Sequence, residues 1–158
     1  MTELTAGMEA PDFTLESDAG TPVSLSALRG NGVVLYFYPK DNTAGCTTEA
    51  QGFRDHLADF KALGYEVLGV SRDSVKSHCS FRDKQNLNFP LLSDKEETVC
   101  NLYGVLKEKT MYGRLLAFKL TAIFHMISFG KLDLRINPFL YIIHLRFAVT
   151  AFYLYPLV

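Results

Sequence analysis

The feature that most constrains the fold is a regular alternation of short apolar segments with amphipathic ones across residues 33–104. Residues 33–38 (VVLYFY) form an uninterrupted apolar run rich in β-branched and aromatic side chains, which is typical of a fully buried strand. Residues 65–71 and 89–92 also predict strands, and residues 12–15 alternate as a short strand would. Strands that alternate with helices predict parallel β-α-β units, and therefore a three-layer α/β domain.

The segments between these strands carry helix signals. Gly64 follows one apolar stripe, with steps of three and four residues, and is placed to end that helix. The stripe consists of Ala50, Phe53, Leu57, Phe60 and Leu63. Capping residues at 73–74 and 93–94 predict two more helices, which reach about residue 86 and residue 103.

The composition changes near residue 113. Residues 1–113 carry a net charge of −5, whereas residues 114–158 carry +4, and 30 of those 45 residues are apolar. Residues 115–158 show neither a helical nor a strand period, so we predict a domain over 1–113 and a separate hydrophobic tail over 114–158. The longest charge-free stretch of that tail has 12 residues, which is short of the roughly 18–20 that span a bilayer.

The composition also excludes several classes of function. A net charge of −1 and 48% hydrophobic residues exclude a polybasic nucleic-acid binder and a disordered chain. Residues 1–11 have no basic or apolar stretch typical of a secretory signal, so a cytoplasmic location is expected. The three cysteines form no disulfide framework, and no metal or cofactor is predicted. The histidines also lack metal-ligand spacing: His56, His78, His125 and His144.

Cys46 is the strongest candidate for chemistry. It lies at the predicted turn from strand 33–38 into the following helix, at the sheet edge where α/β domains bind ligands. Free amides and the helix dipole at such a position stabilise a thiolate. Thr43 can place a hydroxyl beside the sulfur, and Pro39 stiffens the loop that shields it. Such a thiolate is suited to attack a small electrophile such as a peroxide, which would convert Cys46 to a sulfenic acid.

The spacing Pro39-x-x-x-Thr43-x-x-Cys46 resembles the active-site pattern of peroxiredoxins, which have a thioredoxin-like fold. The surrounding words resemble the Q-type, or bacterioferritin comigratory protein-like, members over about residues 4–113. These words are APDF, FYPK, GCTTEA, VLGVSRDS, NFPLLSD and KEKTMYG.

This resemblance implies a thiol-dependent peroxidase that reduces hydrogen peroxide and organic hydroperoxides. Cys46 would be the peroxidatic cysteine, and Thr43 and Pro39 would shape the peroxide pocket. Thioredoxin or another thiol would be the reductant, and the protein would be a monomer or a weak dimer.

The sequence departs from the family first in its resolving cysteine. Many Q-type members carry one five residues after the peroxidatic cysteine, where this chain has Gln51. Other members carry one that would fall near Arg82. Cys79 lies one turn earlier on the same predicted helix face and could resolve Cys46, or the mechanism could use a single cysteine and an external thiol. Cys100 lies on the apolar side of a helix and is expected to pack in the core.

The second departure follows Gly113. The family continues with a strand whose arginine binds the thiolate and the peroxide, and that arginine would fall at Thr121. We therefore expect the strand that completes the sheet to be replaced by residues 114–158, which a frameshift would explain.

Two other interpretations remain open. The chain could be a thiol–disulfide oxidoreductase, although it has no CxxC motif and Thr43 stands where the first cysteine would be. It could also be a catalytically impaired thioredoxin-fold module.

Overall fold

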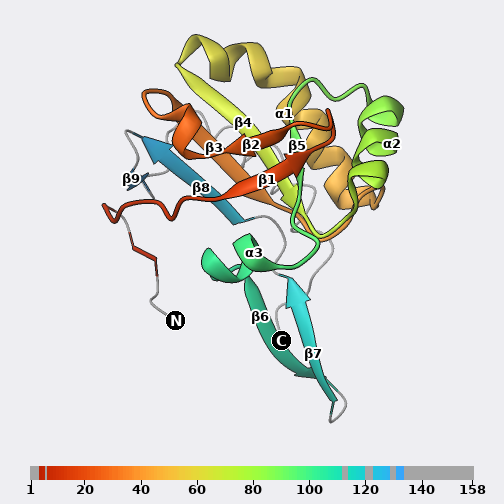
Figure 1. The fold of residues 1–158 in the computed structure, drawn as a ribbon. Helices are drawn as coiled ribbons and strands as arrows, with labels where there is room; N and C mark the ends of the chain where they lie inside the picture. The colour runs from red at the N-terminus through yellow and green to blue at the C-terminus, as the bar shows by residue number, and fades with distance from the viewer. Residues whose placement is uncertain (1–3, 6, 112–113, 120–122, 129–130, 134–158) are drawn as a thin grey trace.

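The fold is built around a seven-stranded mixed sheet with the strand order β2-β1-β5-β4-β3-β8-β9 (Figure 1). The computed structural model describes residues 4–5, 7–111, 114–119, 123–128 and 131–133. β3, β4 and β5 are parallel, and the flanking pairs are antiparallel. The strands are β1 (Thr14–Ser17), β2 (Pro22–Ser24), β3 (Gly32–Phe37), β4 (Tyr65–Ser71), β5 (Leu91–Ser93), β6 (Leu106–Met111), β7 (Arg114–Lys119), β8 (Ile123–Ser128) and β9 (Lys131–Asp133). The helices are η1 (Ser26–Leu28), α1 (Ala44–Ala62), α2 (Val75–Gln85) and α3 (Thr98–Leu102).

β3 divides the core into two halves because its successive side chains point to opposite faces of the sheet. Val33, Leu35 and Phe37 pack with buried residues from the N-terminal segment, β4, β5 and α3. Val34 and Tyr36 pack instead against the apolar sides of α1 and α2. Both faces of the sheet are therefore covered, which confirms the predicted three-layer, thioredoxin-like α/β/α domain.

The parallel centre follows the sequence pattern closely. β4 has the predicted bounds, and β3 differs by one residue at each end. Four residues of the predicted apolar stripe of α1 are buried, but Leu63 is 53% exposed, which corrects the prediction. Leu63 is already the C-cap residue, and Gly64 turns the chain away from the helix with a φ of +78°.

The shorter elements deviate more from the prediction. β1 begins two residues later than expected and pairs with β2, which the sequence pattern did not indicate. α3 has only five residues and begins at Thr98 rather than directly after Asp94. The Asp94 carboxylate nevertheless caps the helix, because it accepts hydrogen bonds from the amides of Val99 and Cys100 at 3.2 and 2.7 Å.

Residues that follow the predicted boundary at 113 take part in the sheet. β8 pairs antiparallel with β3 from Val33↔Ile127 to Phe37↔Ile123, and β9 extends the sheet beyond β8. The place of β8 in the sheet is set by its pairing with β3, a strand about ninety residues earlier in the chain, which no local pattern of residues records. That is why the pattern failed to indicate it. The tail beyond residue 133 lies outside the described residues.

Two further strands form a separate hairpin. β6 and β7 pair antiparallel from Leu106↔Lys119 to Met111↔Arg114 and project from the sheet below α3 in Figure 1. In the described part of the chain, no helix is long and apolar enough to cross a membrane.

Candidate active site

The active-site loop, residues 39–43, carries the chain from the end of β3 into α1. Asn42 adopts a φ of +58° within it, a conformation that asparagine tolerates better than most residues. Thr43 is the N-cap residue of α1, and the first helical hydrogen bond runs from the Thr47 amide to the Thr43 carbonyl at 2.9 Å. Cys46 is therefore in the first turn of α1, where its own amide has no intrahelical acceptor.

Cys46 is buried, and it lies in the first turn of α1, where the backbone amides have no intrahelical acceptor. The residue is only 7% exposed and belongs to the core cluster that contains Tyr36 and Phe53. The Thr43 hydroxyl donates to the Lys40 carbonyl at 3.1 Å, which fixes the shape of the loop in front of the helix. A thiolate at this position has the positive end of the helix dipole on one side and apolar rings on the other.

Three titratable groups lie close enough to the buried Tyr36 to affect its pKa. Burial raises the pKa of Tyr36 well above its usual value, and the nearby negative charges of Glu49, Cys46 and Asp41 raise it further. Glu49 lies one turn after Cys46 on α1. Burial raises the pKa of this half-buried carboxyl from 4.5 to about 7. The site therefore places an acid that can hold a proton near neutral pH on the same helix face as the thiol.

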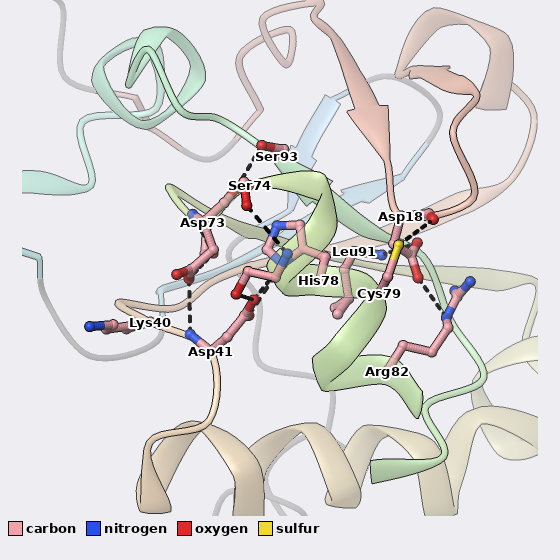
Figure 2. Close-up of polar contacts among 12 residues, drawn as sticks. Asp18, Lys40, Asp41, Asp73, Ser74, His78, Cys79, Arg82, Leu91 and Ser93 are labelled. Carbon is pink, nitrogen blue, oxygen red and sulfur yellow. Dashed lines mark hydrogen bonds and ion pairs between the residues drawn. The ribbon is translucent and has the colours of Figure 1, made fainter. Parts of the chain in front are cut away.

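A buried pair connects the active-site loop to α2. The His78 imidazole is fully buried, and its Nδ1 lies 2.9 Å from Oδ2 of Asp41 (Figure 2). Tyr38 donates its hydroxyl to Oδ1 of Asp41 at 2.7 Å, and Ser77 donates to Oδ2 at 2.7 Å. Burial by itself would raise the pKa of Asp41, but hydrogen bonds from His78, Ser77 and Tyr38 hold it below the usual value.

Asp73 adds a second attachment to the loop. Its carboxylate accepts a hydrogen bond from the Asp41 amide at 2.9 Å and from the Ser71 hydroxyl at 2.7 Å. Ser93 donates to the Asp73 carbonyl at 2.6 Å. The loop is thus bonded to the carboxyl ends of β4 and β5 as well as to α2.

Cys79 lies on a different side of α2 from His78. Its thiol donates to the Asp18 carbonyl at 3.1 Å, in the turn between β1 and β2 (Figure 2). Arg82, one turn later, forms a 2.6 Å ion pair with the buried Asp18 carboxylate and donates to the Phe89 carbonyl at 2.8 Å. An arginine with a structural role therefore occupies the position where the family resemblance would place a resolving cysteine.

The structure brings together Pro39, Thr43 and Cys46 on one loop and helix start. The Cys79 thiol instead contacts the Asp18 carbonyl. Cys100 is fully buried, as expected. Thr121 lies outside the described residues, and within the described ones no group of three or more residues could hold a metal ion.

Sequence reasoning missed Asp41 and His78 as parts of this site. Asp41 lies in a polar segment that resembles an ordinary exposed loop, and it is 37 residues from His78. One signal was present: His78 is three residues before Phe81, so the two share the buried face of α2.

The comparisons with known proteins agree with this geometry. Residues 6–129 match the AhpC/TSA family, and the match runs past the predicted boundary at residue 113 to include β8. A Coxiella burnetii protein named as a bcp peroxiredoxin is 55% identical over 108 residues, which cover 68% of this chain and 72% of that protein.

Solved structures extend this likeness to the fold. A variant of Xanthomonas campestris peroxiredoxin Q has a TM-score of 0.74 and 42% identity, covering 78% of each chain. The bacterioferritin comigratory protein of the same organism, described for its alkyl peroxide reduction activity, has a TM-score of 0.79 and 36% identity over 93% of this chain and 99% of that one. With its cysteine in the first turn of α1, the chain therefore belongs to the AhpC/TSA family and is a Bcp- or Q-type peroxiredoxin, a thiol-dependent peroxidase.

Proposed function

We propose that Cys46 is the peroxidatic cysteine and that Pro39 and Thr43 form the pocket that receives the peroxide. The Cys46 thiolate attacks one oxygen of ROOH, the O–O bond breaks, and the products are the Cys46 sulfenic acid and RO⁻, which takes up a proton. The substrates are hydrogen peroxide and organic hydroperoxides, in line with the alkyl peroxide reduction described for the Xanthomonas campestris relative.

The placement of Cys46 is the observation that carries this proposal. A cysteine attacks a peroxide as the thiolate and not as the thiol. The first turn of α1 supplies backbone amides and a helix dipole that stabilise a thiolate at Cys46. Its 7% exposure limits access to a small reagent that can enter beside the loop. A bulky disulfide substrate would not reach the sulfur without rearrangement, so the site favours peroxide over general thiol–disulfide exchange.

The catalytic cycle is completed by a thiol. We propose thioredoxin, or another thiol reductant in the reducing cytoplasm, as the electron donor. The role of Cys79 as the resolving cysteine stays a prediction. The Cys79 thiol donates to the Asp18 carbonyl, and it would have to leave that carbonyl before it could attack Cys46. The alternative is direct attack of an external thiol on the Cys46 sulfenic acid, which yields a mixed disulfide and water.

Replacing the thiol tests the assignment directly. After one equivalent of peroxide, Cys46 should be labelled by dimedone, and Cys46→Ser should abolish both the labelling and peroxide consumption. Cys79→Ser is the matched control and should retain dimedone labelling at Cys46. Labelling at another cysteine that persists in Cys46→Ser would assign the chemistry elsewhere.

A further inference from the structure

Resting on the proposed function, we propose that the Asp41–His78 pair is a positioning contact that holds α2 against the active-site loop and thereby slows capture of the Cys46 sulfenic acid by Cys79. Asp41 and His78 would act through the position of α2 and would not touch the peroxide.

Two polar clusters attach α2 to the rest of the fold, one on each side of the helix (Figure 2). The first joins Asp41 of the active-site loop to His78 and Ser77. The second joins Asp18, in the turn after β1, to Cys79 and Arg82. Figure 2 shows His78 directed toward Asp41 and Cys79 directed toward Asp18. The side of α2 that faces the active-site loop therefore presents an imidazole and not a thiol.

Both ring nitrogens of His78 contact polar groups in the first cluster. Nε2 lies 3.2 Å from the Leu92 carbonyl, and Nδ1 lies 2.9 Å from the Asp41 carboxylate and 3.3 Å from the Tyr38 hydroxyl. His78 and Asp41 are almost fully buried, at 0% and 2% side-chain exposure. Separating the two side chains leaves buried polar atoms without hydrogen-bond partners, which resists movement of α2.

A Cys46–Cys79 disulfide requires that movement. The two sulfurs must come within about 2.05 Å, with Cα atoms less than about 7 Å apart. In the structure both cysteines are free, and the Cys79 thiol is bonded to Asp18. The sheet order places β4 between β3, which leads into the Cys46 loop, and β5, which is bonded to Asp18. The Cys79 thiol must therefore leave the Asp18 carbonyl before the sulfurs can meet, and the contact between His78 and Asp41 opposes any shift of α2 that accompanies this release.

The sulfenic acid has two competing fates during that interval. Attack by the Cys79 thiol forms the Cys46–Cys79 disulfide and releases water. Attack on a second ROOH instead converts Cys46 to a sulfinic acid and releases ROH. A contact that holds α2 in place slows the first reaction only. The Asp41–His78 pair should therefore influence the fraction of Cys46 that is converted to sulfinic acid in each turnover at a given peroxide concentration.

The test compares Asp41→Asn, which removes the charge with little change in shape, with Ser77→Ala, which removes one hydrogen bond to Asp41 and is the milder change. Disulfide and sulfinic acid are quantified by peptide mapping after graded peroxide, and the rate of sulfenic acid formation is measured separately in each variant. We expect disulfide formation to be faster by about two- to tenfold in Ser77→Ala. We expect a larger increase, and less sulfinic acid per equivalent of peroxide, in Asp41→Asn.

Asp59→Asn is the matched control. It breaks another aspartate–histidine contact, the exposed one between His56 and Asp59 within α1, which does not involve α2. Its ratio of disulfide to sulfinic acid should equal that of the wild type. An unchanged ratio in both test variants, or no Cys46–Cys79 disulfide in any of the proteins, overturns the proposal. Absence of dimedone labelling at Cys46 would instead reject the proposed function.

Discussion

Both ring nitrogens of His78, a fully buried residue, have a specific protein partner. Nδ1 meets the Asp41 carboxylate and Nε2 meets the Leu92 carbonyl. Removing one partner of a buried hydrogen bond typically costs about 1–3 kcal/mol, because the polar group that remains is buried without a partner. The same residue therefore supports the fold and constrains α2, which is why the milder Ser77→Ala is needed beside Asp41→Asn.

Glu49 gives the site a pH dependence that can be measured as stability. Its folded pKa of about 7 lies above its unfolded value of 4.5, so the folded state holds a proton that the unfolded state loses as the pH rises. Stability is therefore highest at low pH with respect to this group and falls as the pH rises through about 7. Between pH 5 and pH 8, the wild type should lose roughly 1–3 kcal/mol more unfolding free energy than Glu49→Gln.

Urea unfolding at the two pH values checks this expectation for Glu49. Glu96→Gln, at an exposed position on the loop before α3, is the control and should follow the wild type. Parallel losses in the wild type and in Glu49→Gln would show that burial of Glu49 does not disfavour its charge.

The residue at position 121 should limit the step with peroxide. The family resemblance places there an arginine that stabilises the charge moving onto the leaving oxygen, and this chain has Thr121. One such donor typically supplies about 2.7–4 kcal/mol, so we expect sulfenic acid formation to be about a hundredfold or more slower than in a family member that has the arginine. Thr121→Arg should recover part of that rate in stopped-flow measurements.

Lysine is the appropriate comparison at this position. Thr121→Lys restores a positive charge but not the planar fork of a guanidinium, so it should recover less of the rate than Thr121→Arg. A wild-type rate equal to that of relatives with the arginine would show that this donor is dispensable here.

Some helices and strands follow from the local sequence pattern, whereas others depend on contacts with residues distant in the chain. β3, β4 and α1 could be predicted because their apolar patterns are long and are matched by burial in the structure. α3 could not be placed, since Asp94 caps its amides from five and six residues away. β8 could not be predicted, because its pairing with β3 depends on a strand about ninety residues earlier in the chain.

The candidate site divides in the same way. Pro39, Thr43 and Cys46 are contiguous in sequence, so a local motif contains them. The link from the active-site loop to α2 joins Asp41 to His78, and only the packing of α2 beside the loop brings these two together. No local pattern in the sequence could have predicted that contact.

For the whole molecule, β8 determines whether β3 is an internal strand. β3 carries buried side chains on both faces and pairs with β4 along one edge and with β8 along the other. A chain that ended at residue 113, the predicted domain boundary, would leave that second edge open. An unpaired edge on an apolar strand is a template for association between molecules.

We therefore expect a variant consisting of residues 1–113 to have a lower Tm than one consisting of residues 1–133, because β3 loses its antiparallel partner on the β8 side. The shorter variant should also associate as its concentration rises, which size-exclusion chromatography would detect. Since β3 ends at Phe37, one residue before the active-site loop, fraying of that edge should also loosen the loop and slow dimedone labelling at Cys46. Equal stability, association state and labelling rate in the two variants would show that residues 1–113 fold independently and that the pairing of β8 with β3 contributes little.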